Sequence, residues 1–570
     1  MQAYTGKRAL ALSLFILPFL AWHYLQDGLP QSRESRDLPT PSRDLYIGLS
    51  LLVALLWALM LVPVFLWPRS SLGSFMHGTI AWDVVYYHLP KAVNLIQEGH
   101  FWNLAIPYGQ YPVGWESLLA LSISINGNAE GLGPATGIAL VGFYLSWYVL
   151  LQRETAWPGP VVALLVGIMT FSFYLPVPNN PWREFARVMH YTSGIGKNDL
   201  LSAALVLSAL VHLPLSSRHM ERQAHPTGLA LSLAAALAVK PHAGLSVLGL
   251  IVIAKIIVKS RFRWSSKLFC LITASLGVSW LIRNLVILKR PFSPIASILA
   301  HKSIFYALPQ AIFWHSHPKT WWLVSAMLLF STLLVLLKAY SHWRGPLAAA
   351  WVLYVIFLVT PASVRLHGTQ MRVAWRFGLA LLAWIWTLAW AFVAHGIPRI
   401  PDQFFQSWPI SSNWRFFLRR MGLWLSLLAT AALFWRYGER LSLQPQHAWI
   451  LYDPFPQPVG TLGYHSVFDF IHRRVRQAVI DFDGAPPWYV YDPELTNRAV
   501  RPGHYPGGMP TAVSQPKPTH WLFCAAKWQP HGKVEDPLQV VQQVVQWRSQ
   551  GLQILYIDQA CALARQGPNP

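Results

Sequence analysis

The stretch Ala81-Trp82-Asp83-Val84-Val85-Tyr86-Tyr87-His88-Leu89-Pro90-Lys91 lies just past an apolar span at about residues 45–67. It brings an acid, a base and a cation to the edge of that span, in a chain where only 12% of residues are charged. Ionisable groups at membrane depth are costly, so a cluster of them usually lines a polar site or passage. The alternative is an ordinary solvated loop, but a second acid opens another apolar span, in Lys197-Asn198-Asp199. The pattern indicates chemistry on a charged lipid.

The composition is typical of polytopic helical membrane proteins, because 54% of the 570 residues are hydrophobic. The mean hydropathy of +0.34 agrees with this class. About twelve apolar windows are long enough to cross a bilayer of roughly 30 Å. They begin near Ala9, Leu45, Leu132, Pro158, Leu200, Thr227, Ala243, Leu268, Thr320, Pro346, Ala374 and Met421. The first is predicted to be a retained helix, because Trp22-His23-Tyr24 is not a small-residue cleavage site. Residues 115–125 are predicted to form a half-span or an interfacial helix.

Orientation follows from the basic residues of the short loops. Five Lys and Arg residues between 255 and 267 mark that turn as cytoplasmic under the positive-inside rule. Counting spans from there puts Asp83, Asp199 and the whole C-terminal region on the outer face. Lys7 and Arg8 argue for the opposite orientation, but several later loops outweigh one early pair.

The formal charge is +22, which favours contact with anionic membrane lipids. Nucleic-acid binding is not predicted, because the basic residues are scattered over loops and form no stripe. The predicted outer loops keep many cations that topology does not require there, and a phosphate-bearing ligand would explain them. These cations are Lys91, Arg183, Arg187, Lys197, Lys240, Lys289, Arg290, Lys302, Arg365 and Arg372.

Two domains are predicted. Residues 1–436 form the multi-pass membrane domain, with a catalytic outer loop at about residues 68–130, and residues 437–570 form a small soluble α/β domain. In the second domain, β-rich runs at 448–452, 488–491, 520–524 and 552–557 alternate with helical spacing at 467–479 and 540–547. The Pro/Gly-rich loop at 501–508 lacks the glycine spacing of a phosphate loop, so no nucleotide is assigned to it.

Three cysteines do not predict a disulfide framework. Cys270 lies in an apolar span, while Cys524 and Cys561 lie in the C-terminal region. A bridge between these two would require an oxidising compartment, and the sequence favours unpaired thiols over that bridge. No Cys/His spacing indicates a zinc site.

An ordered set of local patterns spreads over most of the membrane region. It consists of Asp83 with Tyr87-His88-Leu89-Pro90-Lys91, Tyr111-Pro112-x-Gly114-Trp115-Glu116, Gly196-Lys197-Asn198-Asp199-Leu200, Val239-Lys240-Pro241, Arg283-Asn284 with Pro291-Phe292-x-Pro294, and Arg376-Phe377. In order and spacing this set resembles the membrane glycosyltransferases of the GT-C fold. The branch it resembles is the bacterial one related to aminoarabinose transferases and protein O-mannosyltransferases.

The resemblance implies a polyprenyl-phosphate sugar as donor and a reaction on the outer face of the bacterial inner membrane, with inversion of the anomeric centre. Asp83 would be the general base and Asp199 a second active-site acid, because a carboxylate must take the proton of the acceptor hydroxyl. Cations would stabilise the leaving phosphate. The candidates for this are Lys91, Lys197, Lys240, His242, Arg283 and Arg376, and the other predicted substrate contacts are Tyr87, His88 and Glu116.

The chain departs from better-known members of the family at two points. It has no Asp-x-Asp pair after the first span, which leaves a divalent metal ion open, and no Trp-Trp-Asp acceptor motif. The sugar and the acceptor, whether lipid, glycan or protein, also stay open. Individual candidates have simpler explanations: His88 could pack or cap a helix, and Arg376 could extend toward the lipid interface. Lys240 is harder to dismiss, because it interrupts the apolar run 229–239.

Two other classes of protein fit the same composition. A secondary transporter or lipid flippase would have about as many spans, but it would show two similar halves. No such repeat is visible, and Asp83 and Asp199 lie at the ends of spans, not near their middle. A non-catalytic assembly factor with an outer α/β domain is the third alternative.

Overall fold

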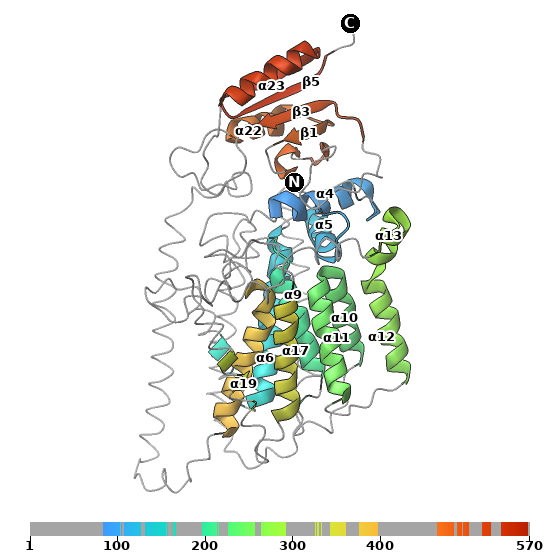
Figure 1. Ribbon diagram of the computed structural model, residues 1–570, viewed down its shortest axis with the longest axis vertical. Helices are drawn as coiled ribbons and strands as arrows, with labels where there is room; N and C mark the ends of the chain where they lie inside the picture. Colours follow the sequence, from blue (N-terminus) through green and yellow to red (C-terminus); the bar gives the residue numbers. More distant parts are fainter. Residues whose placement is uncertain are drawn as a thin grey trace, which may run out of the picture.

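The computed structural model describes the chain in segments, most of which are helical (Figure 1). The segments are 84–102, 108–126, 132–155, 196–213, 226–256, 264–291, 343–360, 375–396, 464–483, 487–492, 494–500, 516–525 and 537–567, with a few isolated positions between them. A bundle of long helices forms one part of the molecule, and an α/β unit lies beyond one end of it. Short helices stand between the two parts.

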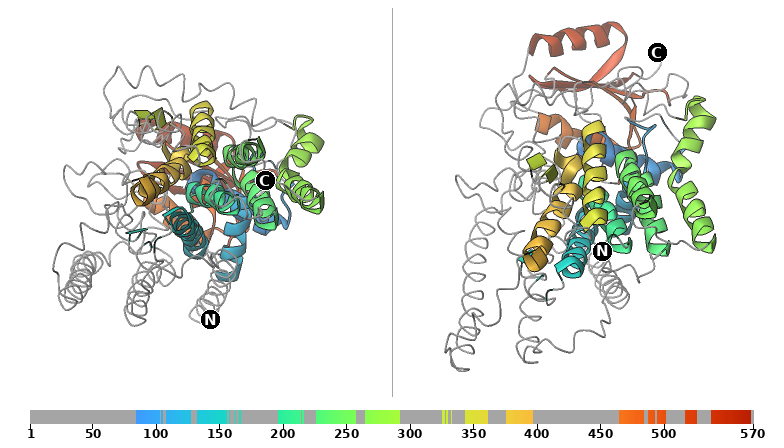
Figure 2. Two further views of the ribbon diagram at one scale, coloured as in Figure 1. Left: turned by 90° about the horizontal axis from the view of Figure 1, so that it is seen from below. Right: turned by 60° about the horizontal axis from the view of Figure 1, so that its bottom comes forward.

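The bundle is built from apolar helices packed side by side, as both views in Figure 2 show. They are α6 (Leu132–Thr155), α9 (Asp199–His212), α10 (Pro226–Val239), α11 (Pro241–Ile256), α12 (Trp264–Gly277), α13 (Ser279–Leu288), α17 (Arg344–Val359) and α19 (Leu379–Gly396). Helix α9 packs against α6, α10 and α11, and α17 packs against α11 and α19. Large apolar side chains on the outside of α12, including Leu268, Leu271 and Leu276, are more than half exposed, as expected for a surface that faces lipid.

One described helix, Ala135–Thr155 within α6, is both long and apolar enough to cross a membrane. A second passes the same test only if Leu271–Gly277 and Ser279–Leu288, which meet at 49°, count as one broken span. Seven of the predicted windows, those near residues 132, 200, 227, 243, 268, 346 and 374, coincide with helices of the bundle. The windows near Ala9, Leu45 and Met421 lie outside the described residues.

The chain reverses between α10 and α11 at Lys240. Pro241 opens α11, a position that suits proline because the first helical residue needs no hydrogen-bond donor. The two helices then pack against each other, and Gly244 permits this, since a Cβ there would collide with a methyl carbon of Leu237. The reversal brings the Lys240 side chain to Asp199, in the first turn of α9.

The layer between the two parts contains η2 (Val84–His88), α4 (Leu89–Glu98) and α5 (Gly114–Asn126). Proline stands in the first turn of α4, and Gly99, at φ +69°, ends the helix in the left-handed conformation that glycine adopts easily. One face of α4 is buried in a core shared with α5, through Leu89, Ala92 and Val93.

The α/β unit is a five-stranded mixed sheet in the order β2-β1-β3-β5-β4. Its strands are β1 (Val479–Asp483), β2 (Arg498–Val500), β3 (His520–Cys524), β4 (Leu552–Ile557) and β5 (Cys561–Gln566). Strand β1 is parallel to β2 and β3, whereas β5 is antiparallel to β3 and β4. Helix α22 (Tyr464–Arg474) packs with one set of sheet side chains and α23 (Pro537–Ser549) with another, because alternate residues of a strand point to opposite faces.

The predicted strands at 520–524 and 552–557 are confirmed, and so is the helix at 540–547. Residues 488–491 were predicted as a strand, but the structure forms a 3-10 turn, η9 (Pro487–Val490). Pro487 opens this turn, and the fixed φ of proline suits the first position of a helical turn. Helical spacing was predicted to continue to Val479, yet α22 ends at Arg474 and Val479 begins β1. The boundary at residues 436/437 and the run at 448–452 lie outside the described residues.

Cys524 and Cys561 form a disulfide, which is the pairing that the sequence disfavoured. The register of the sheet explains it. Cys524 ends β3 and Cys561 begins β5, and the two residues lie directly opposite each other in the antiparallel ladder, with 4.1 Å between their Cα atoms.

Candidate functional site

Asp199 lies in the first turn of α9, one turn after a residue that α5 contacts, Gly196. The turn before it depends on Gly196, whose φ of +76° is costly for residues with a side chain. A carboxylate at this position is favoured, because the free N–H groups at a helix start carry partial positive charge. The Asp199 side chain is only 3% exposed, so it needs a partner inside the protein.

That partner is Lys240, whose Nζ donates a hydrogen bond to Oδ1 of Asp199. The reversal between α10 and α11 places Lys240 there, 41 residues along the chain from Asp199. The Lys240 side chain keeps 15% of its surface exposed, and its Nζ lies 5.2 Å from the centre of the Phe377 ring, within the range of a cation–π contact. The pair therefore combines a buried carboxylate with a partly accessible ammonium group.

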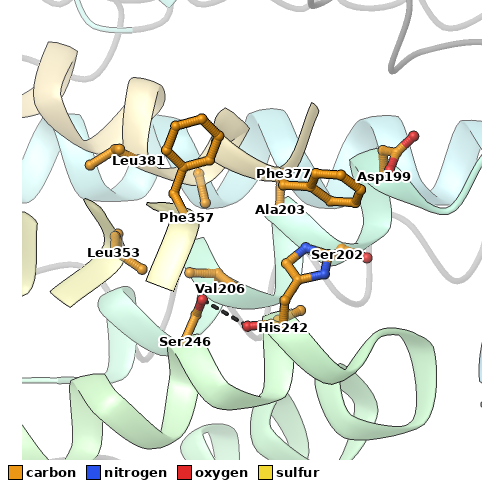
Figure 3. Close-up of a pocket in the computed structure, with 12 residues that line it drawn as sticks. Asp199, Ser202, Ala203, Val206, His242, Ser246, Leu353, Phe357, Phe377 and Leu381 are labelled. Atoms are coloured by element: carbon orange, nitrogen blue, oxygen red, sulfur yellow. Dashed lines mark hydrogen bonds between the residues drawn. The ribbon is translucent and has the colours of Figure 1, made fainter. Parts of the chain in front are cut away.

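A pocket runs from this carboxylate into the bundle (Figure 3). Asp199, Ser202 and His242 line one end of it, and the His242 ring meets the edge of the Phe377 ring with 5.0 Å between their centres. Apolar side chains from α9, α17 and α19 line the rest: Val206, Leu353, Phe357 and Leu381. The Asp199 end of the pocket is polar, and Ser246, whose hydroxyl donates to the His242 carbonyl, lies among the apolar side chains of the rest.

A second group of ionisable side chains joins η2, α4 and α5. Nδ1 of His88 lies 2.7 Å from Oε1 of Glu116, and Lys91 Nζ donates to the same oxygen at 3.2 Å and to the Pro112 carbonyl at 3.1 Å. All three side chains are at most 3% exposed. Burial lowers the pKa of Lys91, and the Glu116 carboxylate opposes that shift. We call these residues the His88–Glu116–Lys91 cluster.

Arg283 and Asn284 of α13 hold the loop between α4 and α5. Arg283 donates to the carbonyl oxygens of Phe101 at 3.0 Å, Gly109 at 2.7 Å and Tyr111 at 3.1 Å. The Asn284 amide donates to the Gln110 carbonyl at 2.7 Å. Because Arg283 is 1% exposed and its guanidinium is committed to these contacts, we assign it to positioning the loop.

Helix α5 connects the two groups through consecutive residues. Glu116 belongs to the His88–Glu116–Lys91 cluster, while Nε1 of Trp115 donates to the Gly196 carbonyl at 2.6 Å, in the turn that precedes Asp199. The Gly196 N–H in turn donates to the Thr136 hydroxyl of α6 at 3.0 Å. Helix α5 also approaches the Lys240 turn closely, since a Cβ on Gly114 would lie 2.7 Å from the Ala238 carbonyl oxygen.

The structure thus brings the predicted residues Asp199 and His242 to one pocket and pairs Lys240 with Asp199. It groups His88, Lys91 and Glu116 in one cluster. Tyr87 borders His88, and Lys197 is buried just before Asp199. Asp83 and the side chain of Arg376 lie outside the described residues. Trp115 and Asn284 were quoted in the sequence patterns but given no role. Their positions beside Glu116 and Arg283 were the signal that could have identified them.

Among the described segments, no three His, Cys, Asp or Glu side chains come together as a group that could hold a metal ion.

Comparisons with known proteins bear on the fold. No family model matches the chain, and no curated protein matches it. Among solved structures, ArnT from Cupriavidus metallidurans bound to undecaprenyl phosphate is similar, with a TM-score of 0.51 and 12% identity over 91% of this chain and 100% of that one. The apo state of the same protein gives a TM-score of 0.46 at 12% identity, over 90% of this chain and 99% of that one. The fold of this chain is therefore similar to that of ArnT, a GT-C aminoarabinose transferase, as the sequence patterns predicted.

Proposed function

We propose that this protein is an inner-membrane glycosyltransferase that moves a hexosyl or pentosyl group from a polyprenyl-phosphate donor to an acceptor on the outer face. The observation that carries the proposal is the Asp199–Lys240 pair, in which a buried carboxylate beside a small pocket holds a partly exposed ammonium group. An ammonium group of this kind suits the phosphate head of a polyprenyl phosphate, because hydrogen bonds between charged partners are the stronger ones. The likeness to ArnT, which was crystallised with undecaprenyl phosphate, supports this class of donor.

In the proposed architecture about twelve spans carry the site, and the C-terminal α/β unit covers its outer side. The outer placement rests on the basic loops and on the Cys524–Cys561 disulfide, since disulfides persist in oxidising compartments such as the periplasm. The described helices account for part of the spans.

The reaction would form a bond between the acceptor oxygen and the anomeric carbon as the bond from that carbon to the phosphate oxygen breaks. Asp83 would take the proton of the acceptor hydroxyl, and the electron pair of the broken bond would leave with the polyprenyl phosphate. The Lys240 ammonium, held by Asp199 and partly exposed, would offset the negative charge that builds on the phosphate. Attack from the side opposite the phosphate inverts the anomeric centre.

The test is transfer of label from a panel of undecaprenyl-phosphate sugars to outer-face acceptors in proteoliposomes. Asp83→Asn keeps the shape of the side chain but cannot accept the proton, so turnover should fall about a hundredfold or more while donor binding persists. Glu494→Gln, which changes an acid 60% exposed on the α/β unit, is the control. Near-normal transfer by Asp83→Asn would move the base to Asp199 or Glu116. A wild type that moves lipid or solute without sugar transfer would favour a transporter.

Lys240→Ala tests the phosphate contact in the same assay. One charge-assisted hydrogen bond is worth about 1.5 to 3 kcal/mol, so donor binding should weaken by roughly 10- to 150-fold. Lys255→Ala, at the exposed far end of α11, removes the same charge and should leave donor binding unchanged. Equal donor affinity in the two variants would remove Lys240 from the phosphate site.

The transfer assay after treatment with EDTA decides whether a divalent metal ion takes part in the reaction.

A further inference from the structure

Three tyrosines form a continuous aromatic surface beside the His88–Glu116–Lys91 cluster. The ring centres of Tyr87 and Tyr108 lie 4.9 Å apart, and those of Tyr108 and Tyr111 lie 5.5 Å apart. Tyr87 also contacts the His88 ring, with 4.2 Å between the centres. All three tyrosines are partly exposed, whereas the cluster behind them is buried. We call Tyr87, Tyr108 and Tyr111 the tyrosine cluster.

The backbone that carries this cluster is held in a costly conformation. Tyr108 has a φ of +54°, which is uncommon for a bulky residue, and conformations of this kind cost about 1 to 3 kcal/mol. Arg283 and Asn284 fix the turn through the carbonyls of Gly109, Gln110 and Tyr111. Gly109 itself is pressed against the Leu104 backbone, since a Cβ there would lie 2.6 Å from the Leu104 carbonyl oxygen. The rings of Tyr108 and Tyr111 are therefore presented on a rigid support.

The chemistry of this surface differs from that of the Asp199–Lys240 pair. The charged groups behind the tyrosines are buried and bonded to one another, so the surface offers aromatic faces and phenolic hydroxyls in place of an ammonium. A phosphate group would bind to a cation in preference to this surface. An isoprenoid chain has no polar group that could hydrogen-bond with the phenols. A sugar ring fits both features, because its C–H face stacks on aromatic rings and its rim of hydroxyls hydrogen-bonds with phenols.

We propose that the tyrosine cluster is a stacking subsite for a sugar ring, distinct from the Asp199–Lys240 pair that contacts the phosphate. The inference rests on the proposed function and extends it from the lipid phosphate to the sugar. The two sites are linked through α5, where Glu116 contacts His88 beside the tyrosines and Trp115 contacts the turn before Asp199. The ring belongs to the donor or to a sugar-bearing acceptor, and the experiment separates these sources.

The experiment compares two ligands of the purified full-length protein in detergent: undecaprenyl phosphate alone and undecaprenyl phosphate carrying the sugar that the wild type transfers. Binding is measured by ligand-dependent shifts in melting temperature. Tyr87→Leu, Tyr108→Leu and Tyr111→Leu should each lower the preference for the sugar-bearing lipid by about 10-fold, with little change for the lipid alone. The matching Phe variants keep the ring and should retain most of the preference. Trp102→Leu removes an aromatic residue that is 42% exposed in the same loop and should have no effect.

Turnover assays on the same variants identify the source of the sugar ring. A raised KM for the acceptor, with an unchanged preference between the two lipids, assigns the subsite to a sugar of the acceptor.

The proposal is overturned if the Leu variants keep both the donor preference and the acceptor KM, or if they weaken binding of the sugar-free lipid equally. Tyr87 is not in the left-handed turn, so its variant decides the matter if changes at Tyr108 prevent folding. A wild type that binds and transfers no polyprenyl-linked sugar overturns the proposed function together with the subsite. Transfer that the Leu variants leave intact overturns the subsite alone.

Discussion

At the scale of single residues, Arg283 holds one loop through three of its backbone carbonyls. It is almost completely buried, and its hydrogen bonds reach loop carbonyls more than 170 positions away in sequence. Hydrogen bonds to a charged group contribute about 1.5 to 3 kcal/mol, and a buried carbonyl that loses its donor costs about 1 to 3 kcal/mol. The loop between α4 and α5 therefore depends on this residue.

Arg283→Ala should release that loop and lower the stability of the protein. We expect a fall of several degrees in melting temperature and faster proteolysis between residues 101 and 111. Arg283→Lys should recover little of the loss, because an ammonium cannot reproduce the planar fork that reaches several carbonyls. Arg290→Ala is the control, since Arg290 is exposed near the end of the same helix. Equal melting temperatures and cleavage rates for Arg283→Ala and Arg290→Ala would contradict the positioning role.

Asp492 plays a comparable part in the α/β unit. It is buried and accepts hydrogen bonds from the Asn497 backbone N–H at 2.6 Å and from the Thr496 hydroxyl at 2.8 Å. Burial alone would raise the pKa of Asp492, but these hydrogen bonds outweigh burial and hold the pKa below its usual value. The folded state therefore favours the charged carboxylate.

This lowered pKa predicts a pH dependence of stability. Asp492 should contribute its full stabilisation above the unfolded pKa of about 3.9 and lose it as the pH falls through the lower folded value. Asp492→Asn should remove this contribution, so the variant should be less stable than the wild type at pH 7 and closer to it near pH 3. Denaturant unfolding of the α/β unit across this range checks the prediction. A difference in stability that does not change with pH would show that the charge of Asp492 plays no part.

At the scale of elements, α5 is the short helix on which both polar groups depend. Its first turn packs against the end of α10, Glu116 anchors His88 and Lys91, and Trp115 holds the Gly196 turn. A shift of α5 would therefore displace Asp199 and the His88–Glu116–Lys91 cluster together.

Trp115→Phe tests this coupling, because it keeps an aromatic ring but removes the N–H that the Gly196 carbonyl accepts. One such hydrogen bond contributes about 0.5 to 1.5 kcal/mol, so we expect kcat to fall by up to about tenfold and the pH profile of kcat to shift as Asp199 moves. A purely structural role would lower the melting temperature and leave the pH profile in place. Trp102→Phe, in an exposed position, serves as the control.

At the scale of the whole molecule, the α/β unit is attached directly to α4. Nε2 of Gln97 donates to the carbonyls of Leu495 and Asn497, both at 2.7 Å, and Arg498 pairs with Glu98 at 2.9 Å. The other end of α4 carries Lys91 of the His88–Glu116–Lys91 cluster. The unit therefore rests on the helix that directly follows Tyr87 and His88, and its stability matters to the site.

The Cys524–Cys561 disulfide should contribute to that stability and also report the orientation of the protein. It closes a loop across 37 positions, for which the chain-entropy estimate is about 3 to 4 kcal/mol. Protein taken from cells without reductant should yield the linked peptide by mass spectrometry, and Cys524→Ser should speed proteolysis of the α/β unit. Cys270→Ser, in α12 of the bundle, should not. Reduced Cys524 and Cys561 in freshly isolated protein would place the unit in the cytoplasm and overturn the proposed orientation.

The sequence by itself predicted a fold of the kind that the comparison with ArnT shows, and it predicted the places of most described helices of the bundle. Hydropathy is a local property, so the windows near residues 132, 200, 227 and 243 could be read without knowing what packs against them. The same holds for β3 and β4, whose residues favour strands. It fails at η9 and at the end of α22, where prolines and the start of β1 override the apolar spacing.

Only the tertiary structure decided which residues meet. Asp199 and Lys240 come together because α9 begins where the chain reverses after α10, and Cys524 meets Cys561 because of the register between β3 and β5. Arg283 looked like a phosphate ligand in the sequence, yet the packing of α13 turns it toward the loop before α5. Contacts between residues separated by 37 to 174 positions depend on how whole elements pack, and neither the spacing nor the composition of one segment records that packing.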